Sequence, residues 1–320
     1  MRVVLCGLTF SPSRDILAPL LPEDELVAVD QHDVPAAVRR ADVLVPMMTR
    51  LDGPLIGATT ARLIQQWGAG LEGVDIDAAT ARDIYVCNVP SDVTPNAEST
   101  AEHALLLILG CARRLRECAR AFDEGVWGAP LGDALFGRRA LIVGFGRIGK
   151  ALARRLLAMG MQVDAIRRSP QPGEAEAHGV GVVGTPADLV RLAAAADVVA
   201  CTATATQESR GLLDARVFRA MKPAAIVVNV GRGAVINEDD LAAALREGRI
   251  AGAGLDVFER EPAPRSHPLL GMEQVLATPH VGGVTRQSYE GIARVIARNV
   301  RAVMARQTPE YCVNLAALAR

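Results

Sequence analysis

The 320-residue chain lacks an excess of charge of either sign, and it lacks a long uninterrupted hydrophobic run. Its 35 Lys and Arg residues nearly balance its 36 Asp and Glu residues, so the formal net charge is −1. Proteins that bind nucleic acid or anionic membranes by electrostatics carry a basic surface, so we expect neither kind of partner. The longest strongly apolar stretch, residues 104–111, is far shorter than the roughly 20 residues that span a bilayer.

The chain also lacks paired cysteines, and we expect no N-terminal targeting signal. None of its six cysteines forms a C-x-x-C pair. Cys111 and Cys118 share a helix face by their spacing, but a metal site would need two further ligands that we do not find. We therefore predict free, buried thiols in a reducing cytoplasm and no bound metal. Residues 1–6 show no apolar run followed by a cleavage site, and we expect them to form a first β-strand.

Short apolar runs alternate with helical, Ala-rich segments through most of the chain. The runs in the first part are residues 3–6, 26–29, 43–47, 63–66 and 84–87. Those in the second part are residues 139–143, 162–166, 180–183, 197–201, 225–230, 251–255 and 274–277. Strands that alternate with helices form parallel sheets covered by helices on both faces. The sequence therefore predicts an α/β protein with two doubly wound parallel sheets.

Two long helices are expected near the junctions of two domains, which is the number that suits this length. Thr94-Pro95-Asn96 starts a helix that runs to about Ala121, with a possible capping box at residues 99–102. After Thr285 a second helix runs to Met304, and we expect it to pack against the first domain. We therefore predict a discontinuous domain of residues 1–95 plus 286–320, with a second domain of residues 96–285 inserted.

The segment Gly144-Phe145-Gly146-Arg147-Ile148-Gly149 follows an apolar strand and precedes an amphipathic helix at residues 150–159. In this context the glycines permit a tight turn and bring a pyrophosphate close to the helix N-terminus. The segment therefore predicts a dinucleotide site, and the alternative is a glycine turn that only connects strand to helix.

The residues after the next strand indicate which dinucleotide binds. An NAD site places an acidic residue there, about 20 residues after the glycine motif, to accept from the ribose hydroxyls. Here the strand is followed by Arg167-Arg168-Ser169, whose guanidinium and hydroxyl groups suit the 2′-phosphate of NADP. We predict NADP as the cofactor, with NADPH preferred over NADH. Two alternatives stay open: a solvated basic turn, and ribose binding by Asp164 within the strand.

Arg232, Glu261 and His280 each lie at or soon after the end of an apolar run, and together they suit proton transfer on an oxyacid. An imidazole titrates near neutrality, a neighbouring carboxylate can hold it protonated, and a guanidinium binds a carboxylate. Glu259 is an alternative to Glu261, and Arg232 could instead be a structural arginine between two glycines. The other histidines are weaker candidates: we expect His32 and His178 to be solvated, His103 to be packed or capping, and His267 to lie at a rim.

Eight segments in order resemble the D-isomer-specific 2-hydroxyacid dehydrogenase family, above all its NADP-dependent glyoxylate/hydroxypyruvate reductase members. They are Gln66-Trp67-Gly68-Ala69-Gly70, Asn88-Val89-Pro90, Thr100-Ala101-Glu102, residues 144–149, Met221-Lys222-Pro223, residues 229–233, Gly254-Leu255-Asp256-Val257 with Glu261-Pro262, and Thr278-Pro279-His280. The resemblance covers nearly the whole chain. It implies a flavodoxin-like substrate domain built from both termini, an inserted Rossmann cofactor domain, and a homodimer.

The resemblance also implies roles for individual residues. Arg232 would bind the carboxylate and carbonyl of the substrate, His280 would donate a proton to the carbonyl oxygen, and Glu261 would orient His280. Backbone N–H groups near Ala69 and Gly70 would hold the substrate carboxylate. The implied cofactor contacts are Thr100, Arg147, Ile148, Thr204, Gly231 and, at the nicotinamide carboxamide, Asp256. The sequence departs from the family at Thr202-Ala203-Thr204, where His-x-Pro is usual.

We therefore predict a D-specific, NADPH-dependent reductase of a small 2-oxo acid such as glyoxylate or hydroxypyruvate. One alternative is a reductase of a larger or sugar-derived 2-oxo acid that uses the same groups. The other is a non-catalytic dinucleotide-sensing protein, similar to the transcriptional corepressors that keep this fold.

Overall fold

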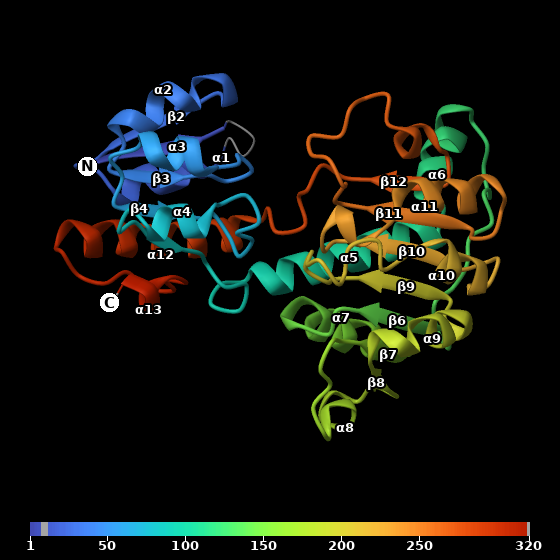
Figure 1. Cartoon of the computed structure of the whole chain (residues 1–320). Helices are drawn as coiled ribbons and strands as arrows, with labels where there is room; N and C mark the ends of the chain where they lie inside the picture. The colour runs from blue at the N-terminus through green and yellow to red at the C-terminus, as the bar shows by residue number, and fades with distance from the viewer. Residues whose placement is uncertain (8–11, 319–320) are drawn as a thin grey trace. The chain divides into compact units, whose positions relative to one another are not determined.

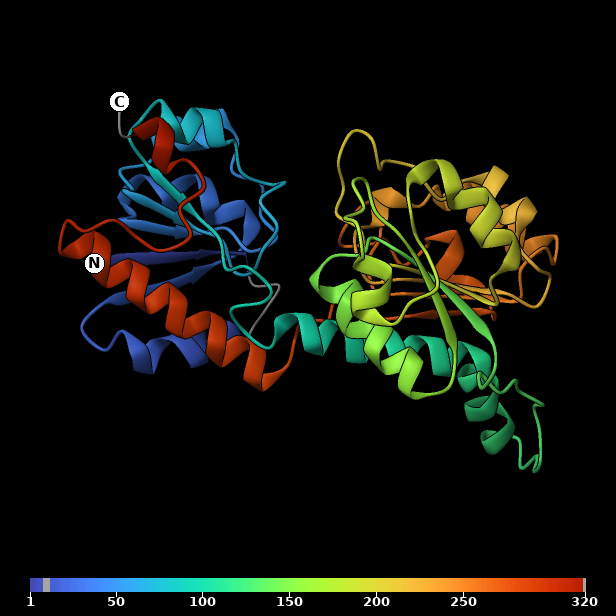
Figure 2. The same ribbon diagram turned by 90° about the horizontal axis from the view of Figure 1, so that it is seen from below.

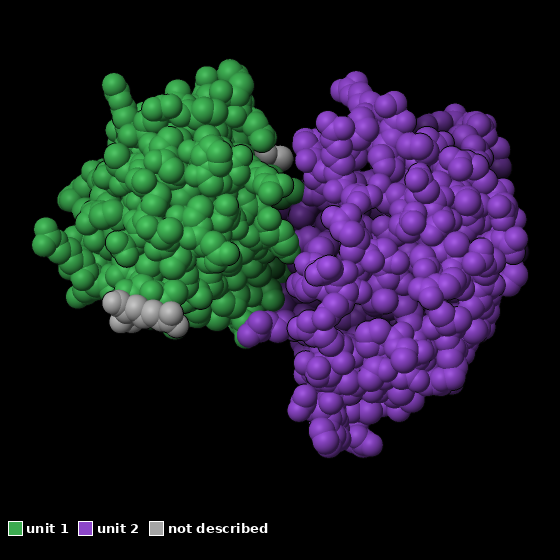
Figure 3. Space-filling model, viewed as in Figure 1, with its two compact units in different colours: residues 1–96, 285–320 green, residues 97–284 purple. Residues whose placement is uncertain are grey.

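The computed structural model describes residues 1–7 and 12–318 (Figure 1). The chain forms two compact units, Met1–Asn96 with Thr285–Arg320, and Ala97–Val284 (Figure 3). The domain boundaries in the sequence analysis, 95/96 and 285/286, differ from these by one residue each, and residues 319–320 lie outside the described residues. The assignment of a substrate role to one unit and a cofactor role to the other stays a prediction.

The first unit contains a five-stranded parallel sheet in the order β2-β1-β3-β4-β5. The strands are β1 (Arg2–Cys6), β2 (Glu25–Val29), β3 (Val43–Val45), β4 (Leu63–Gln65) and β5 (Tyr85–Cys87). Val4 in β1 lies opposite Val27 in β2 and Leu44 in β3, and Val4 and Leu44 are fully buried. This strand order is that of the flavodoxin-like fold, as the sequence predicts.

A helix from the far end of the chain completes the first unit. The helices are α1 (Pro12–Leu17), α2 (Val34–Ala37), α3 (Gly53–Ala58), α4 (Ile76–Thr80), α12 (Arg286–Met304) and α13 (Leu315–Leu318). The red helix α12 runs beside the strands of this unit in both views and packs against α1 and β4 (Figure 1, Figure 2). Its buried Asn299 donates from Nδ2 to Gln65 Oε1 at 2.7 Å. The predicted return of the terminal helix to the first domain is therefore confirmed.

The second unit contains a seven-stranded parallel sheet in the order β12-β11-β10-β9-β6-β7-β8. The strands are β6 (Arg139–Val143), β7 (Gln162–Ile166), β8 (Val183–Gly184), β9 (Val198–Cys201), β10 (Ile226–Asn229), β11 (Gly252–Leu255) and β12 (Val275–Ala277). From β8 to β11 this is the doubly wound Rossmann order, to which β12 adds a seventh strand. The predicted fold, with two doubly wound parallel sheets, is confirmed.

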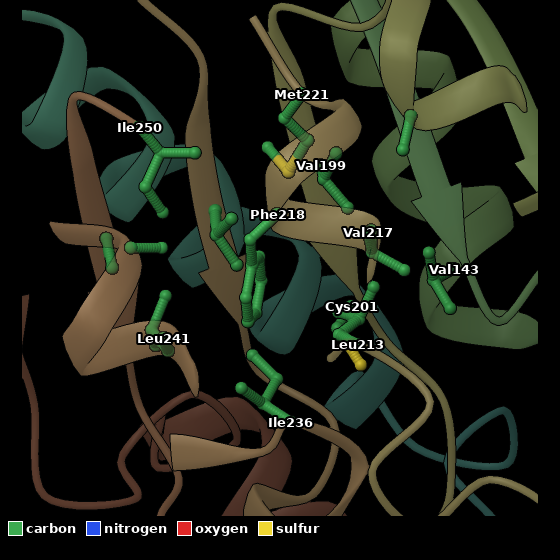
Figure 4. Packing of buried hydrophobic residues seen from close by; sticks show 14 of the residues in the cluster. Val143, Val199, Cys201, Leu213, Val217, Phe218, Met221, Ile236, Leu241 and Ile250 are labelled. Atoms are coloured by element: carbon green, nitrogen blue, oxygen red, sulfur yellow. The ribbon is translucent and has the colours of Figure 1, made fainter. Parts of the chain in front are cut away.

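Both faces of the seven-stranded sheet are buried, because successive strand residues point to opposite faces. Leu141 and Val143 of β6 join one apolar cluster, which Figure 4 shows around Phe218. Ala140 and Ile142 join the other cluster. The helices of this unit are α5 (Asn96–Ala112), α6 (Leu115–Asp123), α7 (Arg147–Ala158), α8 (Glu174–His178), α9 (Leu189–Ala195), α10 (Ala215–Ala220) and α11 (Glu238–Arg246), of which α6 buries no side chain. This two-sided burial explains why the strands are continuous apolar runs in the sequence.

Three local predictions are wrong. The helix expected as far as Ala121 is interrupted, because Arg114 adopts a left-handed conformation with φ 53° between α5 and α6. Because α5 begins at Asn96, the expected capping box at residues 99–102 lies inside the helix and caps nothing. The strand expected at residues 180–183 is confined to β8, because the segment before it closes the end of α8, where Gly179 has φ 66°.

Among the described helices, none is both long and apolar enough to cross a bilayer.

Candidate active site

The three candidates for proton transfer lie at one edge of the seven-stranded sheet. Arg232 follows β10, Glu261 follows β11 and His280 follows β12, and these three strands are adjacent and parallel. Their carboxyl ends therefore meet at the same edge, which is where open α/β sheets bind ligands. The loops are in close contact, because a Cβ on Gly233 would lie 1.8 Å from the carbonyl carbon of Phe258.

His280 and Glu261 form a hydrogen-bonded pair. The imidazole Nδ1 lies 2.7 Å from Glu261 Oε2, and the Phe258 N–H donates to Glu261 Oε1 at 2.8 Å. The alternative partner, Glu259, is held elsewhere by an ion pair with Arg210 at 2.6 Å. Both Glu261 oxygens are thus engaged, so the carboxylate is fixed in position beside the ring.

Asp256 holds the turn that presents His280. His280 adopts a left-handed conformation with φ 53°, and its N–H donates to the Asp256 backbone carbonyl at 2.8 Å. The next two N–H groups, of Val281 and Gly282, donate to the two Asp256 carboxylate oxygens, each at 2.8 Å. Burial alone would raise the pKa of Asp256, but hydrogen bonds from His103, Thr278 and these two N–H groups outweigh it and lower the pKa. The buried carboxylate is therefore ionised, although its nicotinamide contact stays a prediction.

His103 and Thr278 also belong to the hydrogen-bond network around Asp256, and the sequence analysis did not predict these contacts. The Thr278 hydroxyl donates to Asp256 Oδ1 at 2.6 Å, and His103 Nε2 lies 2.8 Å from the same hydroxyl. Because a hydroxyl carries one proton, His103 Nε2 must be the donor in its contact with Thr278. A signal was present in the i, i+3 spacing of Thr100 and His103, which places both on one face of α5. A Cβ on Gly282 would indeed lie 3.3 Å from Thr100 and 3.6 Å from His103.

Arg232 lies half-buried between Gly231 and Gly233. Its Nη1 donates to the Gly231 carbonyl at 2.9 Å, and the buried Asn229 accepts from the Gly231 N–H at 3.0 Å. A Cβ on Gly231 would lie 2.4 Å from the Ala203 carbonyl oxygen, so this loop also packs against the segment after β9.

The glycine motif forms the predicted strand–turn–helix. Gly144 follows β6 with φ 103°, Gly146 is the N-cap of α7, and Arg147 and Ile148 lie in the first helical turn. An adjacent pocket of roughly 380 Å³ is lined by six of the predicted cofactor residues: Gly144, Gly146, Arg167, Arg168, Ser169 and Thr204. An ideal Cβ on Gly146 would meet nothing within 4 Å, so the backbone there is open to the approach of a phosphate group.

The two arginines after β7 have acidic partners. Arg167 binds Glu174, which also binds Lys150, and Arg168 binds Glu208 at 2.8 Å on the surface. The alternative ribose ligand, Asp164, is almost fully buried and pairs with Arg139 on β6 at 2.8 Å. Asp164 does not line the pocket.

The remaining predicted residues and histidines are accounted for as follows. Ala69 and Gly70 lie after β4 in the first unit, where Asn88 Nδ2 donates to the Ala69 carbonyl at 2.8 Å. His267 has a side chain that is 14% exposed and lies 3.0 Å from Glu238, and its place at a rim stays a prediction. His178 is half-buried, with its ring 5.4 Å from the Phe145 ring, whereas His32 is exposed as predicted. The described part of the chain contains no group of three or more His, Cys, Asp or Glu side chains that could hold a metal.

Known proteins are similar to this chain in sequence and in fold. A family model described as D-isomer specific 2-hydroxyacid dehydrogenase, NAD binding domain, matches residues 105–282. A glyoxylate reductase of Thermococcus litoralis is 36% identical over 288 residues, which cover 87% of this chain and 85% of that protein. A D-3-phosphoglycerate dehydrogenase of Mycobacterium leprae is 35% identical over 290 residues, covering 89% of this chain and 53% of that protein.

Solved structures of the same family are similar to this chain in fold. An NADPH-dependent glyoxylate/hydroxypyruvate reductase from Sinorhizobium meliloti, in complex with NADP and malonate, superposes with a TM-score of 0.83. It is 31% identical in sequence, and the match covers 98% of this chain and 96% of that chain.

Proposed function

Because the chain belongs to the D-isomer-specific 2-hydroxyacid dehydrogenase family, we propose that it is an NADPH-dependent reductase of a small 2-oxo acid. Glyoxylate and hydroxypyruvate are the proposed substrates, and a chiral product would be the D-2-hydroxy acid. The observation that carries the proposal is the His280–Glu261 pair, held on neighbouring strand ends beside the Arg232 loop. Similar proteins described as glyoxylate or glyoxylate/hydroxypyruvate reductases support the substrate class.

The proposed chemistry needs three groups of this chain. Arg232 binds the substrate carboxylate, since a guanidinium matches a carboxylate with two parallel hydrogen bonds. His280 gives a proton to the carbonyl oxygen as negative charge develops there. Because Nδ1 is engaged by Glu261, this proton leaves from Nε2. NADPH, when bound, would supply the hydride that this reduction of a carbonyl to an alcohol needs, and the proton would come from His280.

The pocket beside the glycine motif fits the proposed cofactor. The open backbone at Gly146 and the N-terminus of α7 would take the pyrophosphate. Arg167, Arg168 and Ser169 line the same pocket and would donate to the 2′-phosphate. Asp164 offers no acceptor to a ribose there, because its carboxylate is buried against Arg139. These contacts support NADPH over NADH.

We also propose that two copies of the chain associate. The segment that includes α6 and reaches residue 136 exposes Trp127 (83%), Leu131 (90%) and Phe136 (82%). A second copy of this chain would cover these apolar side chains, which water solvates poorly. The six cysteines are free, which is consistent with the proposed location in a reducing cytoplasm.

The experiment is a panel of 2-oxo acids assayed with NADPH and with NADH, followed by nicotinamide absorbance. His280→Ala should lower the turnover number by about 10²- to 10⁴-fold while the NADPH dissociation constant stays nearly unchanged. His32→Ala is the matched control, because His32 is 78% exposed. A wild-type protein that binds NADPH but reduces no 2-oxo acid would refute the enzymatic proposal and support a dinucleotide sensor. A His280→Ala variant with more than about a tenth of the wild-type turnover would refute the role of His280.

A further inference from the structure

A buried carboxylate lies behind the arginine that the proposed function assigns to the 2′-phosphate. Glu174, the first residue of α8, has a side chain that is 5% exposed. Its Oε1 contacts both Arg167 Nη1 and Lys150 Nζ, the latter at 2.9 Å, and its Oε2 accepts from the Gln171 N–H at 3.2 Å. Burial alone would raise the pKa of Glu174, but the contacts with Lys150, the Gln171 N–H and Arg167 outweigh it and lower the pKa. The carboxylate is therefore ionised and shared by two cations.

Lys150 reaches this carboxylate from the neighbouring helix α7. Its ammonium also lies 5.6 Å from the centroid of the Phe145 ring, a geometry that favours a cation over the ring face. Arg167 lines the nucleotide pocket and Lys150 does not. Lys150 and Lys222 are the only lysines in the chain, so Lys222 provides a matched control.

The charges around the pocket can be counted pair by pair. Arg168 and Glu208 cancel each other in an exposed ion pair. If Arg167 and Glu174 were alone, they would cancel in the same way, and a 2′-phosphate would meet an arginine that is already neutralised. With Lys150 present, the group of Arg167, Lys150 and Glu174 carries one net positive charge.

We propose that Lys150 determines cofactor specificity indirectly, by neutralising Glu174 so that the charge of Arg167 is available to the 2′-phosphate of NADPH. This inference rests on the proposed use of NADPH. The 2′-phosphate carries a charge of about −1.5 to −2, so one unit of local charge changes its binding substantially. In a partly exposed, salt-screened site, we expect an effect of about tenfold on affinity.

The test compares adenosine 2′,5′-bisphosphate with adenosine 5′-monophosphate, which differ only in the 2′-phosphate. Isothermal titration calorimetry on the full chain gives both dissociation constants. The dissociation constant of the monophosphate divided by that of the bisphosphate measures recognition of the 2′-phosphate without any catalysis, and this quotient is the ratio used below. Lys150→Met should lower the ratio about tenfold while the affinity for the monophosphate stays unchanged. Lys222→Met should leave the ratio unchanged, because Lys222 pairs with Asp197 before the start of β9.

A double variant separates the charge effect from damage to the fold. Lys150→Met with Glu174→Gln removes one charge of each sign, so the net charge around Arg167 returns to +1. We expect the ratio to recover to within about threefold of the wild type, with unfolding temperatures checked for each variant.

Each outcome has one meaning. A wild-type ratio near one would overturn both the NADPH assignment and this inference. A high wild-type ratio that Lys150→Met leaves unchanged would overturn the inference alone. The inference also fails if the double variant does not recover, or if Lys150→Met weakens both nucleotides equally, because Lys150 would then contact a phosphate itself.

Discussion

Substitution of two glycines in the 144–149 motif should separate folding from cofactor binding. A Cβ on Gly149 would lie 2.4 Å from the Gly144 carbonyl oxygen, 3.0 Å from Thr202 Oγ1 and 3.1 Å from Ile142 Cγ2. Such overpacking costs about 1–3 kcal/mol, and the gain in helix propensity from Gly to Ala offsets up to about 1 kcal/mol of it. The nearest contact is a backbone atom that cannot move aside, so Gly149→Ala should lower the free energy of unfolding by about 1–2 kcal/mol.

Gly146→Ala should show the opposite behaviour. A Cβ at Gly146 meets nothing within 4 Å and its φ of −89° suits alanine, so only the weaker N-cap preference of alanine remains, at about 1 kcal/mol or less. In the proposed complex, however, the added methyl group would occupy the space through which the pyrophosphate approaches.

Urea unfolding with and without NADPH tests both variants. A ligand at 100 times its dissociation constant stabilises the native state by about 2.7 kcal/mol. Wild-type protein and Gly149→Ala should show that stabilisation at a saturating concentration, whereas Gly146→Ala should lose most of it. If Gly146→Ala were stabilised by NADPH as much as the wild type, the pyrophosphate would not bind at this loop, and the assignment of the pocket would be wrong.

Three further variants test the groups around the two sites. Arg232→Lys should raise the KM for the 2-oxo acid by at least about tenfold with little change in NADPH affinity, because lysine lacks the planar fork that binds a carboxylate. Unchanged steady-state kinetics would leave Arg232 with a structural role only. The wild-type kcat/KM with NADPH should exceed that with NADH by about 10- to 1,000-fold, and Arg167→Asp should shift this preference toward NADH. Equal use of both cofactors by the wild type would contradict the assignment of Arg167 to the 2′-phosphate. Asp256→Asn should cost about 2–4 kcal/mol of unfolding free energy at pH 7, because the carboxylate accepts bonds from Thr278, Val281 and Gly282. The folded state lowers the pKa of Asp256, so the stabilisation by its carboxylate is complete above the ordinary aspartate pKa near 4 and is lost as the pH falls further. In urea unfolding, the difference in unfolding free energy between wild type and Asp256→Asn should therefore narrow below about pH 4.

The sheets were predictable from sequence because each central strand is buried on both faces and is bounded by turns. Residues 139–143 and 162–166 match β6 and β7 for that reason. The interruption at Arg114 was not predictable, because residues 111–123 contain no glycine or proline and the left-handed residue is an arginine. The short strand β8 was misplaced because an apolar run at a sheet edge does not show which of its residues pair.

The candidate site was predictable in its residue types and less so in its partners. Strand ends indicated Arg232, Glu261 and His280, but only the folded chain shows that Glu261, not Glu259, contacts the imidazole. His103 lies 175 residues from Thr278 in sequence, so no local pattern reveals their hydrogen bond. Lys150 and Glu174 were missed because the sequence of the 144–149 motif does not show what lies behind Arg167.

The discontinuity of the first unit has a consequence for the order in which the chain folds. Gln65 and Asn299, which are hydrogen-bonded inside that unit, are 234 residues apart in sequence. The second unit, in contrast, is complete once Val284 has been synthesised. Domains generally fold as units during synthesis, so we expect the second unit to become protease-resistant while the N-terminal segment still awaits α12. Limited proteolysis of chains stalled on the ribosome after residue 284 and after residue 304 would reveal this order, and an N-terminal segment already resistant at residue 284 would contradict it. During synthesis, the segment before residue 97 therefore holds all five strands of its sheet but not α12, the helix that packs against α1 and β4.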